Sequence, residues 1–350
     1  MRDLHVFFRS ETGRELHAVA GVSFDIARGE VFGLVGESGC GKTTTVLSLM
    51  GLLPSSATVW GEVRIEGRDI LAGGERAVRA HRWRDVAMVF QGAMNCFSPV
   101  KTIGWQIVEP MKLHGIASGR QARKRVAELL EMVGITASAA ERYPHEFSGG
   151  MRQRAAIAMA LSCEPKILLA DEPTTGLDVM VQAQILELLT GLSKDLGLTV
   201  VLVTHDLPVV AQMCSRAAVM YAGQVAEIGP VDALYHEPHH PYTRLLFGAI
   251  PDLFGEGDVT SIPGVPPRLD RPLAGCPFRA RCDSAFERCI TDCPRLMTVG
   301  PAHEAACHLN DPSALAGAGH LAGETLPRKP ADPSRPEVTR RAAEATGGQP

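Results

Sequence analysis

Three short stretches of the chain are almost entirely apolar, and each is predicted to form a buried strand. They are VFGLV (31–35), KILLAD (166–171) and TVVLVT (199–204). Apolar residues that follow one another without alternation are typical of strands covered on both faces. Helical patterns follow two of these stretches, at 42–52 and 181–196. This order of strands and helices predicts an α/β fold with a doubly wound sheet.

The stretch from residue 92 to residue 160 departs from this order. RQARKRVAELLEMVGI (120–135) and MRQRAAIAMALS (151–162) both have the pattern of amphipathic helices. We therefore expect a helical subdomain over about 92–160, inserted into an α/β core that covers residues 1–240.

The composition changes after about residue 240. Residues 241–310 are rich in Pro, Arg and Cys and have weak periodicity, which predicts a small Cys-rich C-terminal extension. Residues 311–350 contain almost no large apolar side chains, so this tail is predicted to be disordered.

The overall composition excludes several classes of protein. With 45% hydrophobic residues among 350, the chain can bury a sizeable core. The net charge of −4 is unlike the basic surface of a non-specific nucleic-acid binder, so no nucleic-acid partner is expected. No apolar run reaches the roughly 18–20 residues that span a bilayer, and the N-terminus is too charged for a signal peptide. We expect a cytoplasmic protein that reaches the membrane through other subunits.

The segment GESGCGKT (36–43) fits the phosphate-binding pattern G-x-x-x-x-G-K-[ST], between a predicted strand and a predicted helix. Its glycines let the backbone wrap around phosphate, and N–H groups at the helix start point at anionic oxygens. Lys42 is expected to reach the β and γ phosphates, Thr43 to bind Mg²⁺, and Thr44 to contact the α phosphate. The predicted ATP contacts in this segment are Gly36, Ser38, Gly39, Cys40, Gly41, Lys42, Thr43 and Thr44.

The segment ILLADEP (167–173) supplies the second half of the predicted site. Its apolar residues lead a strand to its carboxyl end, where Asp171 can hold Mg²⁺ through water, because this cation prefers oxygen ligands. Glu172 follows directly and is predicted to polarise the attacking water as a general base. Together with the preceding segment, these residues predict an ATPase that uses Mg-ATP.

The segment EFSGGMRQR (146–154) places Ser148, Gly149 and Gly150 before a helix, which gives a second phosphate-binding helix start. It resembles the signature motif of ATP-binding cassette (ABC) ATPases. The resemblance implies that these three residues of one subunit close over the γ phosphate held by a paired, homologous ATPase subunit.

The other motifs of that family stand in the family's order over residues 1–240. Gln91 in VFQG resembles the glutamine that senses Mg²⁺, Asp178 in TTGLD the D-loop aspartate at the dimer interface, and His205 in LVTHD the switch histidine. The resemblance implies a RecA-like P-loop NTPase core. It implies catalytic roles for Glu172, His205 and Gln91, Mg²⁺ contacts from Thr43, Gln91 and Asp171, and an ATP contact from Asp178.

The sequence departs from the family at two places. Met151 stands where the signature usually has Gln, directly after the Ser-Gly-Gly that makes the phosphate contacts. The aromatic residue that stacks on adenine is not identified; the residues near its expected position are Phe7, Phe8, Thr12, Gly13 and His17.

Later segments point to one branch of the family. HHPYTRLLFGAIPD (239–252), IPGVPP (262–267) and GCPFRARC (275–282) resemble the ATPases of oligopeptide, dipeptide and nickel permeases, as does VFQGAMNCFSPV (89–100). The resemblance implies an ATPase subunit that energises peptide import from the cytoplasmic face of the membrane. The implied partners are a second ATPase subunit, two membrane permease subunits and, indirectly, an extracytoplasmic solute-binding protein.

Five of the nine cysteines crowd into residues 276–307, which favours metal binding over disulfides in a reducing compartment. Some members of the permease branch carry an iron–sulfur cluster in this segment. The resemblance assigns a 4Fe-4S cluster to Cys276, Cys282, Cys289 and Cys307, with Cys293 as a substitute for Cys289. Zinc and unliganded thiols stay open, although the spacing lacks the C-x-x-C knuckle common in structural zinc sites.

Other functions fit parts of the sequence. Non-transport ABC ATPases that act as switches in translation usually carry two cassettes, and those in DNA repair carry long coiled-coil insertions; the sequence has one cassette and no such heptads. If the C-terminal cysteines form a redox module, their redox state would matter more for function than ATP turnover. An adenylate-type kinase would have no role for Ser148, Gly149 and Gly150.

Overall fold

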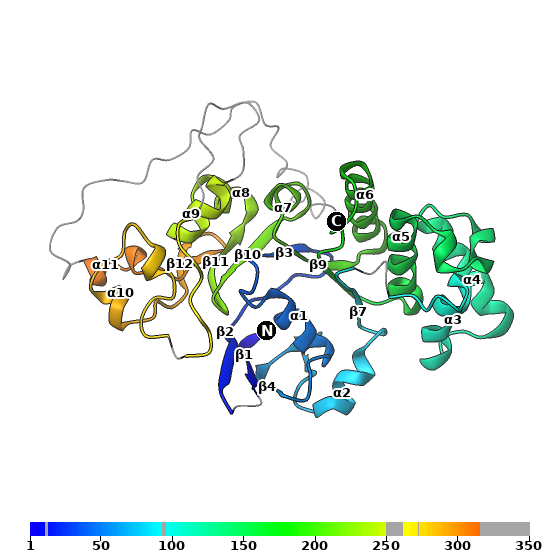
Figure 1. The fold of residues 1–350 in the computed structure, drawn as a ribbon, viewed down its shortest axis with the longest axis horizontal. Coiled ribbons are helices and arrows are strands. Elements are labelled where there is room, and N and C mark those ends of the chain that lie inside the picture. The colour runs from blue at the N-terminus through cyan, green and yellow to red at the C-terminus, as the bar shows by residue number, and fades with distance from the viewer. Residues whose placement is uncertain (11–12, 93–95, 250–261, 272, 316–350) are drawn as a thin grey trace, which may run out of the picture.

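The computed structural model describes residues 1–10, 13–92, 96–249, 262–271 and 273–315 (Figure 1). The strands are β1 (Arg2–Arg9), β2 (Glu15–Val22), β3 (Val31–Val35), β4 (Ala57–Glu62), β5 (Arg64–Ile65), β6 (Arg68–Asp69), β7 (Val86–Val89), β8 (Ile167–Asp171), β9 (Thr199–Thr204), β10 (Arg216–Tyr221), β11 (Gln224–Pro230), β12 (Met297–Gly300) and β13 (His303–Ala305). The α-helices are α1 (Lys42–Met50), α2 (Gly74–His81), α3 (Ile103–Leu113), α4 (Gly119–Met132), α5 (Gly149–Ala160), α6 (Val179–Leu196), α7 (Leu207–Met213), α8 (Val231–His236), α9 (Pro241–Gly248), α10 (Arg288–Thr291) and α11 (Pro312–Leu315).

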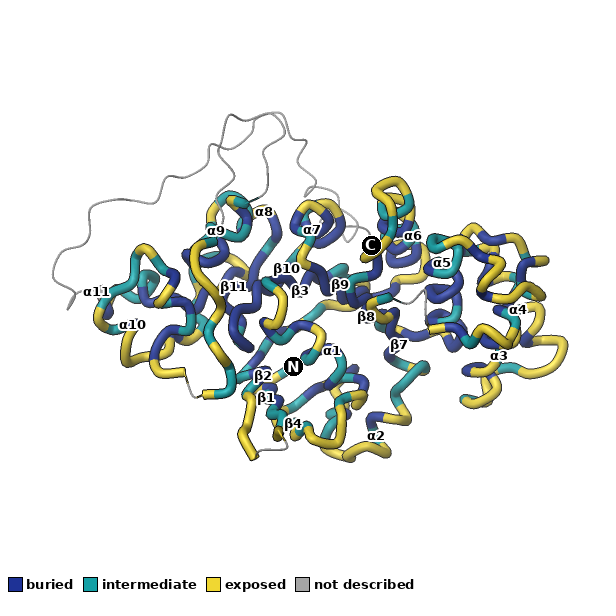
Figure 2. The backbone as a smooth tube through the Cα atoms, in the orientation of Figure 1, coloured by how far each residue is buried: buried dark blue, intermediate teal, exposed yellow. Residues whose placement is uncertain are grey.

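The largest sheet has the strand order β12-β13-β11-β10-β3-β9-β8-β7, and its strands from β10 to β7 run parallel. The three strands predicted from continuous apolar runs are β3, β8 and β9, so these predictions are confirmed. Alternate residues of β9 enter different hydrophobic clusters: Val200 and Leu202 pack in one, Val201 and Val203 in the other. The strands lie deep in the molecule with helices on both sides (Figures 1 and 2). The doubly wound α/β core is thus confirmed.

The helical insertion is also confirmed. Helices α3, α4 and α5 lie together beyond β7, at one end of the large sheet (Figure 1). Helix α4 buries Ala122, Val126, Leu129 and Leu130, a spacing that puts them on one face of the helix. This face packs into the same hydrophobic cluster as one side of the sheet.

A second sheet is three-stranded and antiparallel, with the order β2-β1-β4, and it packs against helix α1. In β1, Leu4 and Val6 are buried while His5 and Phe7 point to the opposite face. Leu4 and Val6 join Val46 of α1 in the second hydrophobic cluster. No uninterrupted apolar run marks this sheet in the sequence, because buried residues alternate with more exposed ones along β1.

The C-terminal extension continues the large sheet. Strand β13 pairs with β11, and β12 pairs with β13, both antiparallel. Helices α10 and α11 lie near these strands, at the end of the molecule opposite to α3–α5 (Figure 1). The domain boundaries at 240 and 310 stay predictions; of the predicted tail, Pro312–Leu315 form α11 and residues 316–350 lie outside the described part.

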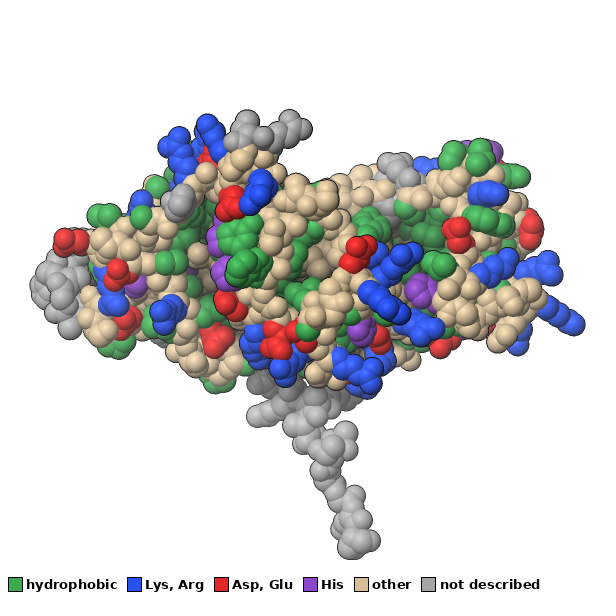
Figure 3. All heavy atoms as spheres, turned by 90° about the horizontal axis from the view of Figure 1, so that it is seen from below, with side chains coloured by type: hydrophobic (Ala, Val, Ile, Leu, Met, Phe, Trp, Pro, Cys, Tyr) green, Lys and Arg blue, Asp and Glu red, His purple; other side chains and the backbone are tan. Residues whose placement is uncertain are grey.

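No helix in the described part of the chain is both long and apolar enough to cross a membrane. On the face shown in Figure 3, Lys and Arg side chains stand among acidic and apolar ones. This mixed surface agrees with the small net charge of −4.

One buried carboxylate joins the extension to the core. Glu227 of β11 is fully buried, and its carboxylate accepts the backbone N–H groups of His239 (2.7 Å) and His240 (2.9 Å). His303 of β13 places Nε2 at 2.7 Å from the same carboxylate. The start of α9 and the added strands are therefore held by one side chain.

We expect Glu227→Ala to lower the free energy of unfolding by about 3–5 kcal/mol, because it leaves several buried polar groups without a partner. Chemical denaturation of the full chain would measure this loss. Glu237→Ala, at an exposed position on the same segment, is the control and should change the value by less than about 0.5 kcal/mol. If both variants lowered the free energy of unfolding by the same small amount, this would contradict the role of Glu227 in joining the extension to the core.

Candidate active site

The predicted phosphate loop connects the end of β3 to the start of α1, as expected. Two of its glycines are required by close approaches of other strands. A Cβ on Gly36, at φ +147°, would overlap the carbonyl oxygen of Met220 at the end of β10. A Cβ on Gly41, at φ +103°, would lie 2.6 Å from the carbonyl oxygen of Ala18 in β2. The loop is thus wedged between the two sheets, and only glycine fits these positions.

Lys42 lies beneath this loop with only 6% of its surface exposed. Its ammonium donates to the carbonyl oxygens of Gly36 (2.7 Å) and Glu37 (2.9 Å). The first turn of α1 therefore combines a fixed positive charge with free N–H groups of a helix N-terminus. This combination favours an anion such as phosphate.

The other predicted catalytic residues meet because parallel strands end at the same edge of a sheet. Gln91 follows β7, Asp171 and Glu172 lie at the end of β8, and His205 follows β9. These three strands are neighbours in the large sheet. Ligand sites in open α/β sheets lie at this carboxyl edge.

The predicted Mg²⁺ residues Thr43 and Asp171 lie side by side. The Thr43 hydroxyl donates to Asp171 Oδ1 at 3.1 Å. Burial raises the pKa of Asp171 and the nearby Glu172 charge adds to this, while the Thr43 hydrogen bond and Lys42 act in the opposite direction. A carboxylate and a hydroxyl at this distance are suitable oxygen ligands for Mg²⁺.

Glu172 is the centre of the predicted catalytic group. Its Oε2 accepts from Gln91 Nε2 (2.8 Å) and from the Thr175 hydroxyl (2.9 Å), and its Oε1 lies 2.9 Å from His205 Nδ1. Burial alone would raise the pKa of Glu172, but the hydrogen bonds from His205 and Thr175, with the charges of His205 and Lys42, lower it overall. The carboxylate is therefore ionised at neutral pH, as a general base must be.

The signature residues and Asp178 lie at two other helix starts. Ser148 caps α5, accepting the N–H of Met151 at 3.3 Å, and Asp178 caps α6, accepting the N–H of Val181 at 3.0 Å. A Cβ on Gly150 would lie 2.5 Å from the Val181 side chain, so the two helix starts pack closely. Within the described ranges, no hydrogen bond or ion pair joins Ser148, Gly149, Gly150 or Asp178 to the phosphate loop.

The other predicted ATP contacts in the loop differ in how far they are exposed to solvent. Ser38, Gly39 and Thr43 are exposed and Thr44 is half-buried. Cys40 is buried, and its N–H already donates to the Glu37 carbonyl at 3.3 Å. The geometry therefore leaves less room for an ATP contact from Cys40 than from its neighbours.

The aromatic rings near the position expected for adenine stacking pack on one another, so the adenine-stacking residue stays unassigned. Phe7 and His17 stack on each other with ring centroids 4.1 Å apart, and His5 stacks beside His17. Phe7 and His5 point away from the side of β1 that packs on α1. Thr12 lies outside the described residues.

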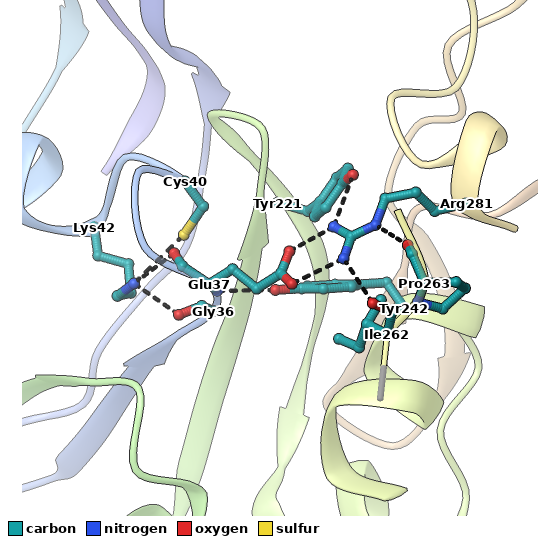
Figure 4. Close-up of polar contacts among 9 residues, drawn as sticks. All are labelled: Gly36, Glu37, Cys40, Lys42, Tyr221, Tyr242, Ile262, Pro263 and Arg281. Atoms are coloured by element: carbon teal, nitrogen blue, oxygen red, sulfur yellow. Dashed lines mark hydrogen bonds and ion pairs between the residues drawn. The ribbon is translucent and has the colours of Figure 1, made fainter. Parts of the chain in front are cut away.

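Sequence reasoning missed a group of residues that contact the phosphate loop from far along the chain. The Tyr242 hydroxyl accepts the N–H of Glu37 at 2.9 Å, and Arg281 forms an ion pair with the Glu37 carboxylate (Figure 4). Tyr242 and Arg281 lie in segments whose sequences resemble the permease ATPases. No sequence pattern predicts that these segments contact residue 37.

The described cysteines do not form a metal site, so the predicted iron–sulfur cluster stays a prediction. Across the described residues, no group of three or more His, Cys, Asp or Glu side chains is arranged to hold a metal ion. The predicted ligands nevertheless share one neighbourhood. Burial raises the pKa of Cys307 to about 12, and the thiols of Cys276, Cys282 and Cys289 lie near enough to raise it further.

Cys293 differs from Cys289 in its exposure. It is exposed, and its thiol donates to Gln224 Oε1 at 3.4 Å, whereas Cys289 is buried. Which of the two would serve as a ligand stays a prediction.

Comparisons with known proteins agree with these motifs. The sequence profile described as "ABC transporter" matches residues 19–175, and the profile "Oligopeptide/dipeptide transporter, C-terminal region" matches residues 226–289. The chain is 46% identical to the "Probable peptide ABC transporter ATP-binding protein y4tR" of Sinorhizobium fredii, covering 88% of this chain and 93% of that protein. It is 45% identical to the dipeptide transport ATP-binding protein DppD of Bacillus subtilis, covering 89% and 94%.

Solved structures are also similar. The ATP-binding cassette MJ0796, in a dimeric post-hydrolysis state bound to ADP and Pi, superposes with a TM-score of 0.57 at 29% identity, covering 66% of this chain and 97% of that one. The structure of cbiO1 from Clostridium perfringens, part of an ABC transporter complex, gives a TM-score of 0.55 at 30% identity, covering 67% and 91%.

We expect Gly36→Ala to lower the affinity for ATP by about 10- to 100-fold, or about 1.4–2.8 kcal/mol, because the loop must move away from Met220. Equilibrium titration with a fluorescent ATP analogue would measure the change. Gly29→Ala is the matched control: its φ is also positive, at +72°, but the nearest atom to a Cβ is 3.8 Å away. If Gly36→Ala bound ATP with unchanged affinity, the loop could move away from Met220 without loss of binding, and the requirement for glycine would be contradicted.

Proposed function

Because the chain belongs to the family of ABC-transporter ATP-binding proteins, in the oligopeptide and dipeptide permease branch, we propose that it hydrolyses ATP to energise peptide import. The observation that carries the enzymatic part is the convergence of Gln91, Glu172 and His205 beside the phosphate loop. The peptide part is supported by the relatives at 42–46% identity, whose names describe peptide, dipeptide or oligopeptide transport.

In this proposal the chain's own residues position ATP and the attacking water. Lys42 and the N–H groups of the loop bind the phosphates. Thr43 and Asp171 would hold Mg²⁺, which would supply charge neutralisation on the phosphates. Glu172 accepts the proton of the attacking water. His205 and Gln91 orient the Glu172 carboxylate through the hydrogen bonds described above. Catalysis then consists of positioning and charge neutralisation, as in other phosphoryl transfers.

A second ATPase subunit completes each site in this proposal. Ser148, Gly149 and Gly150 serve the ATP of the partner, and Asp178 lies at the interface. Two observations support a protein partner here. Val179 and Met180, next to Asp178, are 78% and 72% exposed although both are apolar. The similar cassette MJ0796 is described as a dimer.

The membrane permease subunits are proposed to contact the helical insertion near Gln91. Large apolar side chains are exposed here, namely Phe90, Val100, Trp105, Leu113 and Ile116. A surface of this kind is typical of a protein interface. The chain would then act at the cytoplasmic face of the membrane, with a solute-binding protein contributing only indirectly and no nucleic acid involved.

We expect Glu172→Gln to keep ATP binding but to lose about 10²–10⁴-fold in turnover, the usual contribution of a general base. The assay is ATP hydrolysis and labelled-peptide uptake by the transporter reconstituted in proteoliposomes with the wild-type or variant chain. Lys42→Ala is the comparison and should lose nucleotide affinity instead. Near-normal turnover by Glu172→Gln would sink the base assignment, and peptide-independent ATP turnover without uptake would sink the import function.

We further propose the iron–sulfur cluster as a property of the extension. Its support is that four cysteine thiols, Cys276, Cys282, Cys289 and Cys307, lie in one neighbourhood, where the Cys276 N–H also donates to the Cys289 carbonyl at 2.9 Å. A bound cluster would cross-link four points of the extension.

The chain purified anaerobically should show a broad absorption band near about 400 nm and about four irons with sulfide per chain. Cys282→Ser should lose this iron, whereas Cys293→Ser, at the exposed cysteine, should keep it. A colourless chain free of iron would contradict the cluster; zinc in its place would support the zinc alternative.

A further inference from the structure

An ion pair connects Glu37, in the phosphate loop, to Arg281 in the C-terminal extension. Arg281 Nη1 lies 2.6 Å from Glu37 Oε2, and Nη2 lies 2.9 Å from Oε1. The two residues are separated by 244 positions in the sequence. The Arg281 side chain is only 4% exposed and the Glu37 side chain 26%, so solvent screens this pair only in part.

Glu37 is the residue of the loop through which this contact can act. Its backbone carbonyl accepts the ammonium of Lys42 at 2.9 Å and the N–H of Cys40 at 3.3 Å. Its N–H donates to the Tyr242 hydroxyl at 2.9 Å. Figure 4 shows these contacts around Glu37. A fixed Glu37 side chain therefore restrains the backbone carbonyl that holds Lys42.

Arg281 is itself held rigidly. Its guanidinium donates to the carbonyl oxygens of Pro263 (2.7 Å) and Ile262 (3.5 Å) and to the Tyr221 hydroxyl (3.3 Å). It also lies over the rings of Tyr221 and Phe278, with centroid distances of 5.7 and 5.9 Å. The planar fork of arginine suits such a bidentate, stacked position, and lysine does not reproduce it.

The charge of Glu37 makes this pair relevant to ATP. An acidic side chain next to a phosphate-binding loop repels the anionic ligand unless it is neutralised. Among the described residues, Arg281 is the only cationic side chain that pairs with the Glu37 carboxylate.

We propose that Arg281 is a positioning residue of the ATP site. It neutralises Glu37 and holds the loop in the shape that places Lys42, without touching the nucleotide. The C-terminal extension is therefore part of the nucleotide-binding machinery, and its loss or displacement weakens ATP binding.

The test is equilibrium binding of a non-hydrolysable ATP analogue with Mg²⁺ to the full chain. Arg281→Gln should weaken binding by about tenfold, because it leaves the Glu37 charge unpaired beside the phosphates. Glu37→Gln removes the negative charge together with the ion pair and should lose less affinity than Arg281→Gln. Adding Glu37→Gln to Arg281→Gln should recover the part of the loss that comes from the unpaired charge. In the assembled transporter, the KM for ATP should rise in Arg281→Gln while kcat at saturating ATP changes little.

Arg244→Gln is the matched control. Arg244 donates from Nη2 to both carboxylate oxygens of Asp283, at 2.9 and 3.1 Å, and ties the same extension to α9 without any described contact to the phosphate loop. It should leave the affinity unchanged. If Arg281→Gln does not fold, Arg281→Lys replaces it and should bind with intermediate affinity.

Three outcomes would overturn the proposal. They are affinity within twofold of wild type in a folded Arg281 variant, an equal loss in Arg244→Gln, and no recovery in the double variant. Absence of ATP binding by the wild-type chain would instead overturn the ATPase function itself, so the two failures are distinguishable.

Discussion

The arrangement of the active site depends on the parallel, in-step pairing of four neighbouring strands, β7, β8, β9 and β3. Parallel pairing makes all four strands finish at one edge, and burial on both faces prevents them from slipping. Each strand delivers one component to this edge: Gln91, the Asp171–Glu172 pair, His205, and the phosphate loop. The chemistry is thus assembled by the backbone hydrogen bonds of the sheet, which reach Glu172 itself through its N–H to the Val203 carbonyl at 2.8 Å.

Packing around the phosphate loop imposes a second condition. The loop passes so close to Met220 and Ala18 that a side chain has no space at Gly36 or Gly41. Such tight contact leaves the loop little freedom of its own, so its shape is determined by the strands and side chains around it. The Glu37 ion pair belongs to the same set of restraints, because it acts on the only acidic side chain of the loop.

Much of the fold and most of the site could be predicted from the sequence. Uninterrupted apolar runs identified β3, β8 and β9 because both faces of these strands are covered, and local motifs identified residues that act within a few positions of a strand end. Strands β1 and β12 contain no uninterrupted buried run, so their sequence patterns were weaker. Arg281 and Tyr242 could not be linked to Glu37, since their contact depends on the complete fold. Cysteine spacing suggested a shared metal, but spacing alone does not determine how closely thiols converge.

The span of the Arg281–Glu37 contact has a consequence for how the protein is made. The ribosome produces the phosphate loop early and must add 244 further positions before Arg281 exists. At synthesis rates of about 5–20 residues per second, this interval lasts roughly 10–50 seconds. During that time the emerging chain carries the phosphate loop and gains every other catalytic motif, but the Glu37 carboxylate has no guanidinium beside it. If Arg281 positions the loop as proposed, a nascent or prematurely terminated chain is therefore a weaker competitor for ATP than the finished protein.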